Sequence, residues 1–205
     1  MIHLSQMERD AITEVLNLGM GSAAGTLSEV LDEEIIVSIP SIEFTSKKDM
    51  PGKLGRNSYS QLAAISETFA GPFFGESLLI FSEESGVELV SSLLKTPLLI
   101  AHLSELEEEV LLEVGNMVLN ACLGGIANVL ETEITATIPR VIKGTCENIF
   151  QDLRASMVPE DLIMLLNVTF ELQTKKITGY VTFILGITAV EDFRKLINLR
   201  IGELS

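Results

Sequence analysis

The chain carries the same polar pattern twice, and this repeat restricts its fold more than any other feature. In the first half, Glu14 and Asn17 are three residues apart, and Pro40 follows 23 residues after Asn17. The same residue types recur at a constant offset of 99 positions, as Glu113, Asn116 and Pro139. Because the acid, the amide and the proline all keep their spacing, the sequence indicates an internal duplication.

Both copies of the pattern lie in long apolar runs with helical spacing. We expect one helix over residues 6–31, with Ser5 as its N-cap, and a second over residues 104–131. Side chains three and four residues apart share one face of a helix, so each face also includes the acid four residues before the glutamate, Asp10 or Glu109. Each helix therefore presents carboxylates beside a carboxamide, and we call this row of polar side chains the stripe.

The remaining elements alternate between strands and short helices in both halves. We expect a strand at 34–39 that Pro40 ends or places at a sheet edge, with 41–46 as its continuation. The other expected elements are a turn-rich loop at 47–58, a hairpin of 61–69 and 76–81, a helix at 83–94 capped by Ser82, a linker at 95–103, a strand ending near Pro139, a short helix at 145–153, strands at 162–172 and 177–185, and a last helix at 189–199.

Each half alone would leave a sheet edge open, which pseudo-twofold pairing of the halves would bury. The prediction is therefore one α+β domain over 1–205, with half-repeats of about 1–98 and 99–205. Its continuous antiparallel sheet is flanked by the two long helices that carry the motif.

Packing expectations for the first helix follow from its small and apolar residues. Gly19, Gly21 and Gly25 weaken a helix, so we expect another backbone to approach there. The apolar residues expected on its buried side are Leu4, Met7, Ile12, Val15, Leu16, Leu27 and Val30.

The charge balance excludes one class of partner. With 14 basic and 29 acidic residues, the net charge is −15, whereas nucleic-acid binding needs a clustered basic surface. An acidic chain suits a protein partner with a basic site.

The sequence also favours a cytoplasmic chain that does not cross a membrane. The apolar run 110–130 is interrupted by Glu113 and three asparagines, which would be costly inside a bilayer, so we expect a helix buried in protein. The polar N-terminus is unlike a signal peptide. Cys122 and Cys146 stand apart and read as reduced thiols, and the cysteines and histidines form no zinc pattern.

The stripe is suited to positioning rather than to nucleophilic attack. An asparagine side chain accepts and donates hydrogen bonds, so it can hold a water on a fixed line, while the glutamate can pair with a lysine of a bound protein. A substrate that brings its own metal and electrophile, such as a phosphoaspartate on another protein, needs little more than such an aligned water. The alternative is architectural, with Asn17 capping or bracing a buried loop.

The motif Asp/Ser-x-x-x-Glu-x-x-Asn, followed by 22 residues and Pro, resembles the signature of the CheC, CheX and FliY family of chemotaxis phosphatases. Asp10, Glu14, Asn17 and Pro40 match it in the first half. In the second half Glu109 departs from the usual Asp or Ser. Two signatures in about 200 residues resemble CheC in particular, because CheX-like chains are shorter and FliY adds a flagellar-switch domain.

This resemblance implies dephosphorylation of a phosphorylated CheY-like response regulator. Asn17 and Asn116 would orient the attacking water, and Glu14 and Glu113 would pair with the regulator's lysine. Asp10 and Glu109 would be supporting or docking residues. The chain would need no cofactor of its own, and Mg²⁺ would belong to the regulator.

Two further readings stay open. CheC-like proteins also pair with a CheD-like deamidase through a helix that here corresponds to 145–153, although Lys143 and Gly144 stand where an acidic residue is common. On the plain reading, this segment is a surface helix with Ile149 and Phe150 turned inward. The rival function is a non-catalytic adaptor that binds a response regulator or the deamidase through the same stripe.

Overall fold

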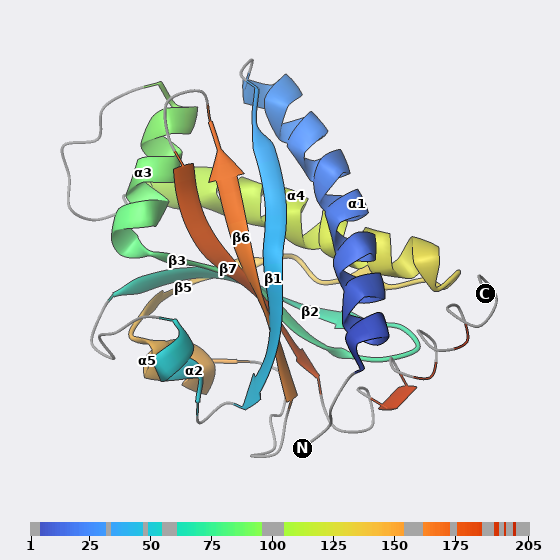
Figure 1. The fold of residues 1–205 in the computed structure, drawn as a ribbon. Coiled ribbons are helices and arrows are strands. Elements are labelled where there is room, and N and C mark those ends of the chain that lie inside the picture. Colours follow the sequence, from blue (N-terminus) through green and yellow to red (C-terminus); the bar gives the residue numbers. More distant parts are fainter. Residues whose placement is uncertain are drawn as a thin grey trace.

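The computed structural model describes residues 5–31, 34–46, 49–54, 61–95, 105–153, 162–172 and 176–185, together with residues 191, 192, 195 and 199. The elements in chain order are α1 (Gln6–Leu31), β1 (Ile36–Ser46), α2 (Met50–Lys53), β2 (Leu62–Ala70), β3 (Gly75–Ser82), α3 (Glu83–Leu93), α4 (Glu105–Val129), β4 (Thr135–Ala136), β5 (Arg140–Gly144), α5 (Cys146–Gln151), β6 (Leu162–Glu171) and β7 (Lys176–Leu185), as Figure 1 shows.

The strands form one antiparallel sheet that mixes the two halves of the chain. Its order is β1-β6-β7-β3-β2-β4, and β5 also pairs with β2. Strand β1 of the first half therefore pairs with β6 of the second, while β4 and β5 of the second half pair with β2 of the first. This continuous sheet with its two long helices confirms the predicted α+β, pseudo-twofold fold class.

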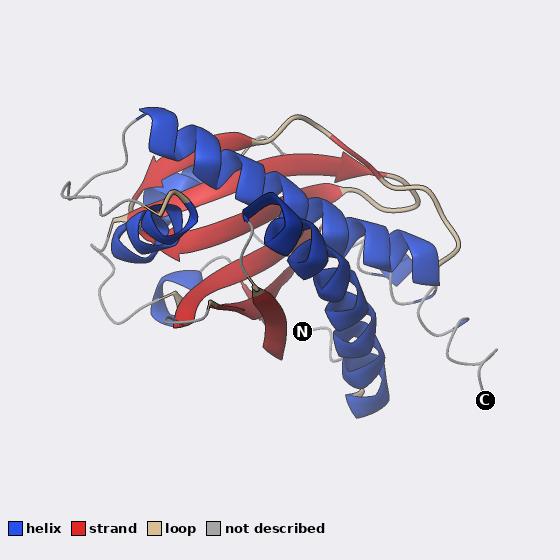
Figure 2. Ribbon diagram, turned by 90° about the horizontal axis from the view of Figure 1, so that it is seen from above, coloured by secondary structure: helices blue, strands red, loops and turns tan. Residues whose placement is uncertain are grey.

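Helices cover both faces of the sheet (Figure 2). On one face α1, α3 and α4 enclose the larger core, and on the other α2 and α5 enclose a smaller one. Strand residues alternate between the two cores, as the twofold periodicity of a strand requires. In β2, for example, Ile65 faces the larger core and Ala64 the smaller one.

Among the described residues, one helical segment, 105–128 of α4, is long and apolar enough by length and composition to cross a membrane. In the fold this helix packs on α1 and the sheet, and one of its sides is buried in the larger core. Its fully buried side chains include Leu111, Val118 and Leu119.

Most expected elements occur close to their predicted bounds. Ser5 caps α1 through a reciprocal pair, in which its Oγ accepts from the Glu8 N–H at 3.2 Å and the Glu8 carboxylate accepts from the Ser5 N–H at 2.6 Å. Ser82 likewise caps α3. The expected linker lies almost entirely outside the described residues, as does most of the expected last helix.

The differences arise where tertiary pairing extends or interrupts a strand. β1 continues through Pro40, with an irregular register between Ser38 and Ser41. The strand expected to end near Pro139 instead has two parts, β4 before the proline and β5 directly after it. The loop expected at 47–58 contains the short helix α2, which occupies the place that α5 has in the second half.

The two long helices cross at glycine. A Cβ built on Gly19 would lie 2.4 Å from the Ala121 carbonyl oxygen, and one on Gly125 would lie 3.1 Å from that of Val15. The close approach expected at Gly19 is therefore correct. It is wrong for Gly21 and Gly25, because no atom of the described part of the chain lies within 4 Å of a Cβ at either position.

The expected buried side of α1 is mostly correct. Ile12, Val15, Leu16 and Leu27 are buried, whereas Met7 is 65% exposed and does not belong to the core. The side chains of Leu4 and Val30 lie outside the described part.

A carboxyl group is buried in the larger core. Glu67 of β2 lies on the same face of the sheet as Ile65 and is 2% exposed. Its Oε1 accepts a hydrogen bond from Ser77 at 3.2 Å, and its Oε2 has no partner among the described residues. Burial raises the pKa of Glu67 to about 7, an effect that the Ser77 hydrogen bond partly offsets.

The helix crossing predicts opposite effects for two glycine substitutions on α1. Gly19→Ala should destabilise the protein by about 1–3 kcal/mol, because the methyl group meets the backbone of α4. Gly21→Ala, the matched control, should stabilise it by roughly 0.5–1 kcal/mol, because alanine favours the helix and meets no neighbour. Urea unfolding of both variants measures this, and equal effects would show that the helices do not touch at Gly19.

The buried Glu67 predicts a pH-dependent stability. The pKa of Glu67 is higher in the folded state than the ordinary value of 4.5, so between these two values the native protein holds a proton that the unfolded chain has released. The unfolding free energy of the wild type therefore falls as pH rises from about 4.5 toward about 7. The unfolding free energy of Glu67→Gln should therefore increase relative to wild type between pH 5 and 8. Denaturant titrations at several pH values test this, with exposed Glu133→Gln as the control that keeps the wild-type slope.

Candidate functional site

The first stripe lies on the outward face of α1. The Asp10 and Glu14 side chains are exposed, and Asn17 is half-buried. Asp10 accepts a hydrogen bond at 2.8 Å from Gln6, one turn earlier on the same helix. The two acids thus meet solvent, while the amide lies at the border between solvent and the core.

The second stripe repeats this arrangement on α4. Glu109 and Glu113 are exposed, and Asn116 is half-buried. The helices α1 and α4 cover the same face of the sheet (Figure 2), and each stripe lies on the exposed side of its helix. The structure thus exposes the acids of both stripes and leaves both amides half-buried.

Exposed apolar side chains flank the stripes. Met7 and Leu18 lie seven residues before and four residues after Glu14 on α1, and are 65% and 69% exposed. Leu106, the counterpart of Met7 on α4, is 63% exposed. At these helical spacings they share a face with the carboxylates, so each site combines negative charge with apolar surface.

The Asn17 amide is bonded to the backbone of β1. Its Oδ1 accepts from the Ile39 N–H at 3.0 Å, and its Nδ2 donates to the carbonyl oxygens of Ile39 at 3.4 Å and Thr13 at 3.0 Å. Ile39 lies in the irregular part of the β1–β6 ladder, just before Pro40. Asn17 therefore supplies hydrogen bonds that the sheet does not, and leaving them unmade would cost about 1–3 kcal/mol.

The Asn116 amide has different surroundings. Its Oδ1 accepts from Asn120 Nδ2 at 2.8 Å. Within the described part of the chain this is its only hydrogen bond, and none joins it to Ile138, the counterpart of Ile39. Its two N–H groups thus remain available to a ligand.

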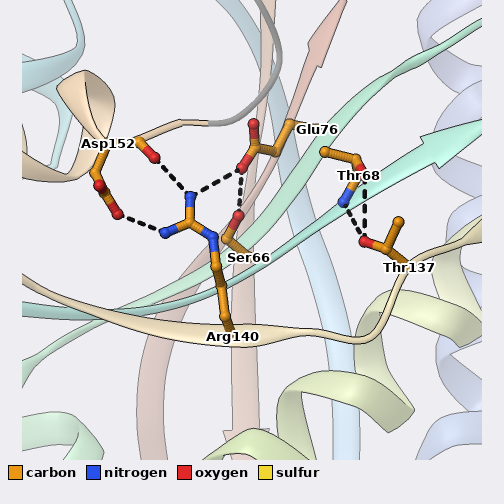
Figure 3. Close-up of polar contacts among 6 residues, drawn as sticks. All are labelled: Ser66, Thr68, Glu76, Thr137, Arg140 and Asp152. Carbon is orange, nitrogen blue, oxygen red and sulfur yellow. Dashed lines mark hydrogen bonds and ion pairs between the residues drawn. The ribbon is translucent and has the colours of Figure 1, made fainter.

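Two anchors hold the segment around Ile138 on the sheet (Figure 3). On one side, Thr137 donates its N–H to the Thr68 carbonyl at 2.9 Å, and its Oγ1 accepts from the Thr68 N–H at 3.1 Å. On the other, Arg140 bonds Asp152 at the end of α5 and lies 3.7 Å from the buried Glu76 carboxylate. Between these anchors Ile138 is 88% exposed, whereas Ile39 is 2% exposed.

The sequence-based prediction missed Asn120 and the two anchors. A signal was present, because the offset of 99 pairs Asn120 with Gly21 and Arg140 with Ser41. At these positions the two halves carry different residue types and make different hydrogen bonds. The spacing alone does not reveal which hydrogen bonds change.

The chemistry open to these groups is limited. Carboxylate and carboxamide groups position and polarise, and neither stripe holds a serine, cysteine or histidine nucleophile. Both cysteines are free and buried, and burial raises the pKa of the Cys146 thiol to about 11 and that of Cys122 further still. Among the described residues, no group of three or more His, Cys, Asp or Glu could hold a metal ion.

The segment that the family resemblance associates with a deamidase contact forms α5. Thr145 caps it, and Ile149 and Phe150 are buried in the smaller core, as the surface-helix reading expects. Its exposed residues are Glu147, Asn148 and Gln151. Lys143, just before the helix, pairs with Glu108 of α4.

Comparison with known proteins identifies a relative of similar sequence. The chain is 26% identical over 178 residues to the flagellar motor switch phosphatase FliY of Bacillus subtilis (strain 168), a match that covers 83% of this chain and 43% of that protein. The chain thus spans less than half the length of this relative. No family model matches the sequence.

Solved structures share the fold. FliY of Thermotoga maritima superposes with a TM-score of 0.80 at 17% identity, covering 97% of this chain and all of that one. The FliM middle domain of H. pylori gives 0.66 at 9% identity, over 94% of this chain and 99% of that domain. CheX of Desulfovibrio desulfuricans gives 0.51 at 13% identity, over 83% and 97%.

The duplicated motif, the sequence match over most of the chain and the shared fold lead to one assignment. The predicted resemblance to the CheC, CheX and FliY family is confirmed: the chain is similar in sequence to FliY and shares the fold of FliY and CheX.

Proposed function

We propose that the chain is a phosphatase for the aspartyl phosphate of a CheY-like response regulator. The observation that carries this proposal is the exposed acid one turn before a half-buried amide, presented twice, on α1 and on α4. The relative from Bacillus subtilis, which is named a phosphatase, supports the same reaction class.

In this proposal the asparagine carboxamide holds a water in line with the phosphorus. Phosphoryl transfer depends mainly on positioning and charge stabilisation, and the regulator brings its own Mg²⁺ and the reactive acyl phosphate. The missing part is an aligned water, which an amide can bind through both its acceptor and its donors. The chain itself then requires no metal and no nucleophile.

The glutamates would direct docking. Glu14 and Glu113 would pair with the lysine of the regulator's active site, and Asp10 and Glu109 would add negative charge one turn away. The exposed Met7, Leu18 and Leu106 would supply apolar contact around these ion pairs. A net charge of −15 favours a partner with a basic site, and the proposed setting is the cytoplasm.

The second candidate function is a non-catalytic adaptor. The observation in its favour is that the same fold occurs in the solved FliG–FliM complex of H. pylori, with a TM-score of 0.66 at 10% identity, where it serves in protein binding. An adaptor would bind the regulator through the same acidic faces, or a CheD-like deamidase through α5, and would leave the lifetime of the phosphate unchanged.

The decay of a radiolabelled, phosphorylated CheY-type regulator distinguishes these functions. We expect the wild-type chain to accelerate decay, and Asn17→Ala combined with Asn116→Ala to reduce the acceleration at least about 100-fold, because the attacking water loses its alignment. Binding should largely survive, since the glutamates remain.

Asn128→Ala is the matched control, because it removes an exposed amide near the end of α4, outside both stripes. It should act as wild type does. A stable complex without faster decay would favour the adaptor, and a double variant as fast as wild type would refute the proposed chemistry.

A further inference from the structure

Building on the proposed function, we infer that the two stripes are not equivalent: Asn116 positions the water, and Asn17 braces strand β1. The duplicated motif by itself predicts the same role for both amides. Their hydrogen bonds differ: Asn17 is bonded to the sheet backbone, whereas the bond that the described residues give Asn116 comes from a neighbouring side chain.

Asn17 cannot serve both roles in one conformation. Its Oδ1 holds the Ile39 N–H and its Nδ2 faces the carbonyls of Ile39 and Thr13, so both ends of the amide are engaged. Turning it toward a water would leave buried Ile39 without these bonds. At the usual cost of unmade hydrogen bonds, the turned state would be about 5- to 150-fold less populated.

Asn116 meets no such cost. Its N–H groups are uncommitted within the described part of the chain, and the hydrogen bond from Asn120 to Oδ1 restricts the rotation of the amide. Position 21, the counterpart of Asn120, is glycine, so the first stripe has no side chain for this purpose. Asn120 is thus a positioning residue of the second stripe.

The reason for the difference lies beside each proline. In the second half, Thr137 is hydrogen-bonded to β2 and Arg140 to the end of α5. Ile138, which lies between them, is exposed to solvent. Their counterparts in the first half are Ser38 and Ser41, which pair with Thr169 and Asn167 of β6. There the irregular segment lies under α1, where, among the described residues, the Asn17 amide bonds the Ile39 backbone.

Single variants test the inference in the same decay assay. At saturating concentrations of the chain, Asn116→Ala should lower the decay rate of the phosphorylated regulator at least fivefold more than Asn17→Ala does. Exposed Glu113 and Glu14 offer a second comparison that does not threaten folding, and Glu113→Ala should raise the half-saturating concentration more than Glu14→Ala. Equal effects within each pair, or a larger effect in the first stripe, would overturn the inference.

Asn120→Ala separates positioning from folding. Since Asn120 is exposed, the melting temperature should stay that of wild type, while the saturating rate falls and the half-saturating concentration does not change. An unchanged saturating rate would show that Asn120 does not orient Asn116.

The brace has a readout independent of catalysis. Hydrogen exchange of the Ile39 amide, followed by NMR, should accelerate at least fivefold in Asn17→Ala, and exchange at Ile138 should not change in Asn116→Ala. Unaltered exchange at Ile39 would refute the brace. If the wild-type chain fails to accelerate decay, the proposed function fails and the catalytic role of Asn116 fails with it, whereas the Ile39 measurement still decides the role of Asn17.

Discussion

Hydrogen bonds between strands from opposite halves of the chain hold this fold together. β1 pairs with β6, and β4 and β5 pair with β2, so neither half has a complete sheet of its own. The exchange places α1 and α4 on the same face, where they approach closely enough at Gly19 that a methyl group would meet the Ala121 backbone. The pairing of strands between the halves therefore determines which sides of α1 and α4 are exposed to solvent, and the stripes lie on those sides.

The two copies of the repeated motif meet different surroundings in the structure. Both prolines interrupt a sheet edge, but the freed backbone is satisfied differently in each half. Asn17 bonds Ile39 in the first, whereas Thr137 and Arg140 fix the strand in the second. Since buried backbone groups need partners, a side chain that supplies them is constrained to stay in place. A duplicated site can therefore keep its sequence pattern while one copy becomes structural.

The proposed chemistry suits the exposed surface on which the two stripes lie. The acids of the stripes are exposed and the amides are half-buried, while the cysteines and Glu67 lie in the core. In the proposed reaction such a surface supplies only the position of the water, and the partner supplies both the metal and the phosphate. Affinity would then come from charge and from the flanking apolar side chains, and catalysis from the placement of one amide.

The sequence by itself determined most of the elements and the helix faces that carry the stripes, because helical periodicity and capping are local. Ser5 and Ser82 cap helices as predicted, and Glu14 and Glu113 meet solvent. Only the tertiary structure decided which backbone each side chain meets. Gly19 and Gly21 differ only in what lies opposite them, and Asn17 reaches a strand 22 residues away while Asn116 does not. Those contacts depend on the crossing of two helices and the path of a strand around its proline, which no local spacing encodes.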